Sequence, residues 1–194
     1  MTLPLKMAGA AVMAALFAVA PAFAHNEGIL HAAGFAAGFT HPLSGLDHLL
    51  AMVAVGWWAT QNQRRAVWIL PLVFSMMVMA GLILGITGIR IPIVESGIAG
   101  SVLALGLLIA FAVRLPVATA STLVGGFALL HGLAHGIEMQ SGTSVGMYAA
   151  GLMLATLVLH ITGVCAGRAM LSNRVTRVVG AAVAATGAWL LAFA

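Results

Sequence analysis

Residues 66–88 read AVWILPLVFSMMVMAGLILGITG, an apolar run without a charged residue. At about 1.5 Å per residue, such a run is long enough to cross the roughly 30 Å hydrocarbon core of a bilayer as a helix. Comparable runs recur along the chain, which is 62% apolar with a mean hydropathy of +1.13. A membrane β-barrel would alternate apolar and polar residues instead. The sequence therefore predicts an all-α protein, a polytopic membrane helix bundle.

Six membrane-spanning segments, numbered here one to six, are predicted after residue 25. They cover residues 40–60, 66–88, 93–113, 116–138, 143–167 and 174–193. The connections are short, and Pro92 and Pro116 lie at or just before span starts, where a missing backbone N–H costs least. Gly and Ala are frequent in spans three to six, as in closely packed membrane helices. We expect a compact bundle with no soluble domain, and the sequence leaves homo-oligomerisation open.

The first 24 residues have the pattern of a secretory signal peptide. Lys6 is followed by an apolar stretch and then by Ala22-Phe23-Ala24, a small-residue pattern typical of a cleavage site. We predict that residues 1–24 are removed and that residues 25–194 form the mature permease domain, with His25 at its N-terminus. An uncleaved first membrane helix is the alternative, although the apolar stretch is short for a span.

The basic residues of the connections indicate an orientation. If residue 25 is outside, the inner connections hold six arginines and the outer ones hold Arg90. The six are Arg64, Arg65, Arg114, Arg168, Arg174 and Arg177. This bias follows the positive-inside rule and agrees with export of the N-terminus by a signal peptide. We therefore predict a multi-pass protein of the bacterial inner membrane whose mature N-terminus is periplasmic.

The apolar residues 28–39 precede span one, and together the two are too long for one crossing of a core of about 30 Å. Pro42 removes one backbone hydrogen bond and disfavours helical dihedrals at His41. We predict a helix break at Pro42, with His41 close to the start of the next helix. A re-entrant or interfacial segment over residues 28–39 is the alternative that the sequence leaves open.

Ionisable residues are few, but the predicted topology groups them. Charged residues make up 6% of the chain, against about a quarter in soluble domains, and each costs about 3 kcal/mol at bilayer depth. The grouped residues are His41, Asp47 and His48 at the start of span one, Glu95 at the start of span three, and His135 and Glu138 at the end of span four. All six lie toward the outer face, and groups this costly to bury indicate a function.

Helical phase refines this grouping. At about 100° per residue, His131, His135 and Glu138 share one face of span four, which is the pattern of a metal-ligand stripe. The alternative is a polar packing seam in which each imidazole bonds a neighbouring carbonyl. Asp47 points about 100° away from His48, so it either completes a site from the side or holds a ligating imidazole in place.

The remaining polar candidates carry less information. Glu95 begins a helix, where the helix dipole alone favours an acid. His160 lies nearer the inner end of span five. We expect it to be a hydrogen-bonded core residue, and if it is functional it marks the inward exit. Met76, Met77 and Met79 are expected to pack, although thioethers can serve as weak transient ligands.

A separate hypothesis concerns the mature N-terminus. After cleavage, the free α-amine and the imidazole of His25 could chelate a divalent cation at the outer mouth, helped by Glu27 and His31. His25 is therefore included among the candidate metal ligands.

Other function classes have little support. The single cysteine, Cys165, excludes an intrachain disulfide and a thiolate-rich metal site, which leaves imidazole, carboxylate and thioether ligands. The basic residues form no patch, so nucleic-acid binding is not expected. The chain has no GxxxxGK[ST] motif, so ATP hydrolysis by this chain is not expected.

The pattern formed by His41, Pro42, Asp47 and His48 in a membrane span, together with the signal peptide and six following spans, resembles the HupE/UreJ family of nickel or cobalt permeases. That family is associated with hydrogenase and urease gene clusters. The resemblance covers the whole chain and is carried onto those four positions alone, while the candidates in spans three and four rest on topology and helical phase. It implies uptake of Ni²⁺ or Co²⁺ as a transient ligand, with no prosthetic group.

Ni²⁺ and Co²⁺ favour nitrogen and oxygen ligands, which the predicted site offers. Facilitated or potential-driven uptake is the expected mechanism. The alternative is an intramembrane zinc-dependent hydrolase, which would take three firm ligands, an open water position and a general base from the same residues. The short loops and small bundle argue mildly against the cavity such an enzyme needs, so we expect no enzymatic activity.

Overall fold

The structure is a computed structural model that describes residues 30–170 and 173–194. These residues form seven helices and no strand. The helices are α2 (Leu30–Ser44), α3 (Leu46–Gln61), α4 (Ala66–Ile86), α5 (Val94–Ala110), α6 (Val117–Glu138), α7 (Val145–Ala169) and α8 (Asn173–Ala192). The predicted all-helical bundle is confirmed for this part of the chain, whereas the predicted signal peptide and His25 lie outside the described residues.

The predicted spans correspond to the six helices α3 to α8, and the largest difference is at span one, where the helix begins at Leu46. By length and composition, α4, α6, α7 and α8 can each cross a membrane, and α5 is a shorter apolar helix. Large apolar side chains on the outer surface, such as Trp68 at 77% and Phe111 at 74% exposure, suit a lipid environment. The chain is a multi-pass helical membrane protein, and the number of six crossings stays a prediction.

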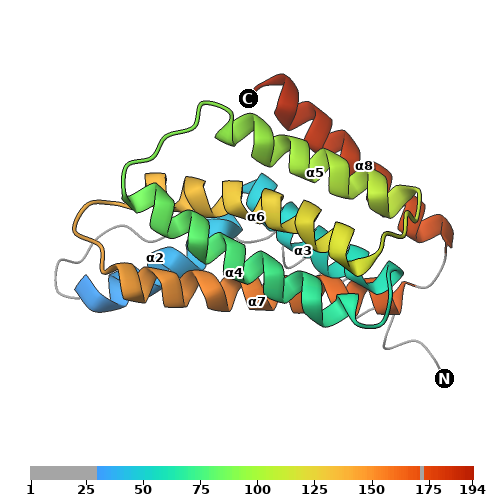
Figure 1. Cartoon of the computed structure of the whole chain (residues 1–194), viewed down its shortest axis with the longest axis horizontal. Helices are drawn as coiled ribbons and strands as arrows, with labels where there is room; N and C mark the ends of the chain where they lie inside the picture. Colours follow the sequence, from blue (N-terminus) through green and yellow to red (C-terminus); the bar gives the residue numbers. More distant parts are fainter. Residues whose placement is uncertain (1–29, 171–172) are drawn as a thin grey trace.

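The helices α3 to α8 alternate in direction, so that their connections lie at two opposite ends (Figure 1). One end holds the α4–α5 and α6–α7 connections, with Glu95 and Glu138 beside them, and is called the carboxylate end below. The other holds the α3–α4 and α5–α6 connections with Arg64, Arg65 and Arg114, and is called the arginine end. The structure thus separates carboxylates from most arginines along the bundle axis.

Helices α4 and α6 interlock through glycines on both sides. Gly81 and Gly85 of α4 and Gly132 and Gly136 of α6 are each spaced four residues apart. A side chain at any of them would run into the other helix's backbone; at Gly132 the obstacle is the Val78 carbonyl. Small residues at this spacing let membrane helices approach closely. The contact fixes the rotation of α6, and with it the direction of the residues that precede its two glycines.

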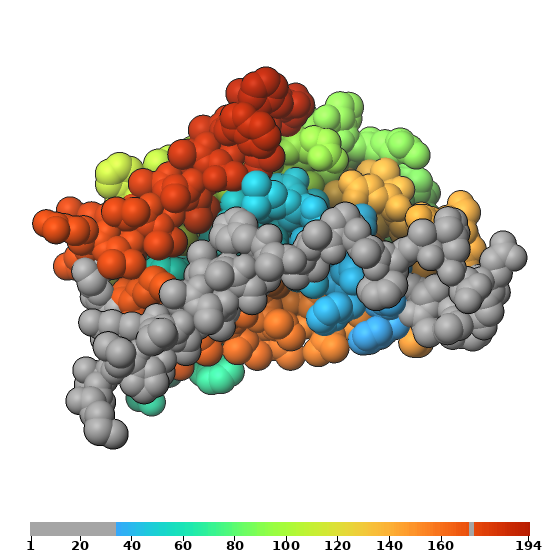
Figure 2. Space-filling view, turned by 180° about the vertical axis from the view of Figure 1, so that it is seen from behind, coloured from blue at the N-terminus to red at the C-terminus, as the bar shows by residue number. Residues whose placement is uncertain are grey.

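Two helices pack against successive parts of α7. Gly151 near its start lies against the Phe35 carbonyl of α2, and Gly163 farther along lies against the Val53 carbonyl of α3. Residues 30–39 therefore belong to a helix that packs along α7. Helix α3 also contacts α4, α5 and α8, and most of it from Ala51 to Ala59 is buried. Helices α5 and α8 pair on one flank of the bundle (Figure 2).

The predicted helix break at Pro42 is wrong in position. Pro42 lies inside α2, near its end, and the interruption is at Gly45, whose backbone is extended with φ −92° and ψ 117°. A Cβ added at Gly45 would lie 2.9 Å from an Asp47 carboxylate oxygen and 3.2 Å from the His48 ring nitrogen Nδ1. The break therefore falls where the absence of a side chain leaves room for the Asp47 and His48 side chains.

Candidate metal-binding site

The first turn of α3 joins Asp47 to His48. An Asp47 carboxylate oxygen accepts the backbone N–H of His48 at 2.8 Å and the ring Nδ1–H of the same residue at 2.9 Å. Because an ionised carboxylate only accepts, Nδ1 carries a proton. The Nε2 of His48 is buried and has no hydrogen-bond partner among the described residues. This geometry is the one expected of a carboxylate that orients an imidazole, and the role of Asp47 toward a metal stays a prediction.

His41 and Glu138 form a second imidazole–carboxylate pair, between helices. The Nε2 of His41 in α2 lies 2.7 Å from a carboxylate oxygen of Glu138 at the end of α6. Their side chains are 30% and 42% exposed, so this pair lies at the rim of the carboxylate end. The residues are 97 positions apart, and the sequence predicted their common depth without predicting that they pair.

His131 and His135 lie on the buried face of α6, with no exposed surface on either residue. The Nδ1–H of His131 donates to the Phe127 carbonyl of the same helix at 2.8 Å, which leaves its Nε2 without a partner. Both ring nitrogens of His135 are without a partner in the described part of the chain. The bond to a neighbouring carbonyl that a polar packing seam predicts is thus present at one nitrogen of His131. It is absent at His135 among the described residues.

The four imidazoles meet in one cluster, called the imidazole cluster below. The ring centre of His135 lies 4.6 Å from that of His48 and 5.0 Å from that of His41. The His48 ring is in turn 5.0 Å from that of His131. Three helices therefore bring their histidines together, although no three His, Cys, Asp or Glu side chains of the described residues are arranged to hold one ion jointly. The cluster is a row of neighbouring imidazoles.

Glu95 lies at the edge of this arrangement. It is exposed in the first turn of α5, within electrostatic range of Asp47, His48 and Glu138. Unlike Glu138, it makes no side-chain hydrogen bond with the described residues. Glu95 therefore lies near the cluster but belongs to neither of its hydrogen-bonded imidazole–carboxylate pairs.

Three buried residues near the cluster were missed or left undecided by sequence reasoning. The Tyr148 ring lies 6.1 Å from that of His41, and its hydroxyl has no partner among the described residues. Phe74 of α4 lies between two histidines, 5.7 Å from the ring of His131 and 5.0 Å from that of His160. The contacts of Tyr148 and Phe74 depend on how the helices pack, so no local sequence pattern could have found them.

The methionines of span two do not line the cluster as a group. Met76 is 63% exposed on the outer surface, and Met77 and Met79 are partly buried against the apolar core. The expectation that Met77 and Met79 pack is confirmed, while Met76 faces outward.

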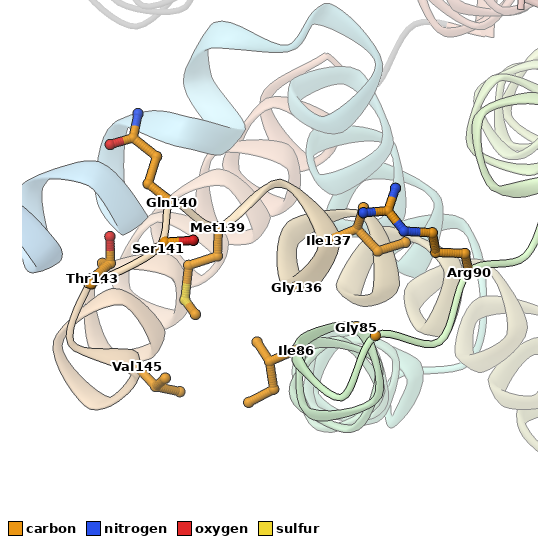
Figure 3. A pocket seen from close by; sticks show the side chains of 12 residues that line it. Gly85, Ile86, Arg90, Gly136, Ile137, Met139, Gln140, Ser141, Thr143 and Val145 are labelled. Atoms are coloured by element: carbon orange, nitrogen blue, oxygen red, sulfur yellow. The ribbon is translucent and has the colours of Figure 1, made fainter.

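A cavity of about 490 Å³ opens at the carboxylate end, beside the cluster rather than within it. Figure 3 shows side chains from three elements around it, including Ile86 after the glycines of α4, Met139 after α6 and Val145 at the start of α7. Arg90 and Gln140 also line it, but no imidazole and no carboxylate does. This cavity is therefore distinct from the candidate metal-binding site.

The fold and the cluster together define a class: a polytopic helical membrane protein with two carboxylate-held histidines at one end and further histidines buried behind them. The family model described as HupE / UreJ protein matches residues 11–190. The chain belongs to this family. It is 48% identical over 176 residues to the protein named HupE of Rhizobium leguminosarum bv. viciae, covering 88% of this chain and 91% of that protein. No solved structure matches the chain.

Proposed function

We propose that this chain is a permease that carries Ni²⁺ or Co²⁺ across the bacterial inner membrane through the imidazole cluster. One observation carries the proposal. At least one ring nitrogen of each of His48, His131 and His135 is buried without a hydrogen-bond partner in residues 30–170 and 173–194. A buried polar group left unpaired costs about 1–3 kcal/mol. A protein that keeps several such nitrogens side by side has a use for them, and neutral imidazole nitrogen is a preferred ligand of these ions.

The carboxylates complete this chemistry at the rim. Glu138 and Asp47 each hold one imidazole, and both add negative charge at the end where an ion would enter. A dication is attracted there before it loses its hydration water. Farther in, its ligands would be the unpartnered nitrogens of His131 and His135, and the hydrogen bond from Nδ1 of His131 to Phe127 would hold that ring in place.

The row of imidazoles suits passage of an ion. A permease must bind its ion well enough to replace water but weakly enough to release it. With neighbouring ring centres 4.6–5.0 Å apart, an ion can exchange one imidazole for the next without crossing an apolar gap. An inside-negative potential would favour inward movement of a dication by a free energy of about 4.6 kcal/mol per 100 mV.

The direction of transport follows from the predicted topology. The arginine end is cytoplasmic by the positive-inside rule, so the carboxylate end faces the periplasm. The resemblance to permeases linked to hydrogenase and urease clusters suggests that the imported ion serves such an enzyme. His25 extends the proposed site at the mouth, and replacing it with Ala while cleavage is kept should weaken uptake at low metal concentration.

The test is uptake of radioactive nickel and cobalt by cells that express the wild type or Asp47→Asn. Asn keeps the size and an acceptor oxygen but removes the charge, and we expect uptake to fall about tenfold or more. Thr87→Val is the control, because Thr87 lies at the same end and its hydroxyl donates to the Leu84 carbonyl of the preceding turn rather than to a residue of the cluster. Normal uptake by Asp47→Asn would contradict the mechanism, and a stoichiometric zinc ion that survives chelation would favour a hydrolase.

A further inference from the structure

Helix α7 carries two buried polar residues outside the imidazole cluster. Thr156 has no exposed surface and His160 is 1% exposed. The Thr156 hydroxyl and both ring nitrogens of His160 have no hydrogen-bond partner among the described residues. Residues four apart on a helix are neighbours on one face, with Cβ atoms about 5–6 Å apart. The two residues therefore place up to three unpaired polar atoms next to each other inside the bundle.

This pair differs from other hydroxyls of the same helix. The Thr162 hydroxyl donates to the Val158 carbonyl one turn earlier, which is the usual way for a membrane helix to satisfy threonine. The Thr156 hydroxyl makes no such bond. It is therefore available to a ligand, as are the nitrogens of His160.

Phe74 separates this pair from the imidazole cluster. The centre of its ring lies 5.7 Å from that of His131 and 5.0 Å, edge to face, from that of His160. At about 1.5 Å per residue, His131 lies roughly 10 Å from the end of α6 at the carboxylate end. His160 lies roughly 22 Å along α7 from the same end. The α7 pair is thus deeper than the cluster and one aromatic ring beyond it.

The backbone around the pair is closely packed. Gly56 of α3 lies against the carbonyl of His160, so that a side chain at position 56 could not be accommodated. The backbone of His160 is therefore packed against α3, while its ring lies against Phe74 of α4. A buried imidazole without a hydrogen bond among the described residues lowers the stability of the fold, unless its nitrogens bind a ligand.

We propose that His160 and Thr156 form a second station for the transported divalent ion, on the side of Phe74 toward the arginine end. This inference rests on the proposed function and names the next residues on the same path. The station offers one imidazole nitrogen and one hydroxyl oxygen, with water completing the ion's ligand shell. It binds the ion more weakly than the cluster, because it has fewer nitrogen ligands and no carboxylate. A weaker inner site allows the ion to leave, as conduction through successive sites requires.

The experiment compares wild type, His160→Leu, Thr156→Val and Thr162→Val as purified full chains. Each is tested for equilibrium binding of Ni²⁺ in detergent and for transport of Ni²⁺ into liposomes that contain a fluorescent chelator. We expect His160→Leu to transport about tenfold more slowly while its binding at the cluster changes by less than about twofold. Thr156→Val should slow transport by about threefold, and Thr162→Val should behave as wild type.

The outcomes separate this inference from the function on which it rests. Wild type that neither binds nor transports nickel would overturn the proposed function, and the second station with it. Wild-type transport by His160→Leu would overturn the second station alone. Loss of equilibrium binding in His160→Leu would also overturn it, because His160 would then act on the cluster. Thr156→Val keeps the test decisive if His160→Leu does not fold.

Discussion

The histidines bonded to carboxylates and the buried histidines without a bond are held in opposite ways. His41 and His48 each bond a carboxylate, at 2.7 Å and 2.9 Å respectively. His135 and His160 bond nothing among the described residues, although both are buried. In each carboxylate-held pair the carboxylate adds negative charge and is partly exposed, whereas His135 and His160 have neither a carboxylate partner in the described part of the chain nor appreciable exposure.

This difference suits the two groups of histidines to different steps, capture of the ion from water and its passage through the bundle. A carboxylate that holds an imidazole fixes its tautomer and attracts a cation from water. An unpartnered imidazole has no competing bond to break when an ion arrives, and it leaves no strong electrostatic trap when the ion departs. Variants of the two groups should therefore fail differently.

The largest effect on transport is expected from His135→Leu, since His135 lies between His41 and His48 in the cluster. Uptake should fall by up to about a hundredfold. The melting temperature should stay the same or rise, because Leu fills a similar volume and no hydrogen bond is lost. Uptake of radioactive nickel and thermal unfolding of the purified protein test both parts. An unfolded variant, or one that transports normally, would contradict the contrast.

A smaller effect, on stability, is expected from Gly132→Ala. The new methyl group would meet the Val78 carbonyl of α4, so overpacking should cost about 1–3 kcal/mol. It should also shift the adjacent His131 and slow uptake. The control is Gly126→Ala on the same helix, where a Cβ meets nothing within 4 Å and stability should not fall. Equal melting temperatures for the two variants would show that the α4–α6 contact does not set the cluster.

The smallest effects are expected from neutralising each of the two glutamates at the carboxylate end. Glu138→Gln removes the charge that holds His41 and should raise the KM for nickel uptake about tenfold. Glu95→Gln removes a charge without a hydrogen bond, and a change of about threefold is expected. The concentration dependence of uptake measures both. A larger change for Glu95→Gln would place the entry at α5 rather than at the α2–α6 pair.

Much of the fold could be predicted because a bilayer demands long apolar helices with short connections. The common depth of His41, His135 and Glu138 also followed from topology. The position of the helix break did not, because Pro42 acts locally whereas Gly45 is required by the space that Asp47 and His48 occupy.

Helical phase placed His131 and His135 on one face of α6 but could not say which helices that face would meet. The sequence left two roles for Asp47, and the hydrogen bond to His48 supports the role of holding an imidazole. The position of Phe74 between His131 and His160 depends on the packing of α4 against α6 and α7, which no local pattern encodes.

The most direct test of the account is ion movement by this chain alone. The purified wild-type protein is placed in liposomes that contain a metal-sensing chelator, with an inside-negative potential and Ni²⁺ or Co²⁺ outside. The account predicts accumulation well above that in protein-free liposomes, and its loss when His135 is replaced by Leu. A folded protein that moves neither ion faster than the lipid alone would contradict it.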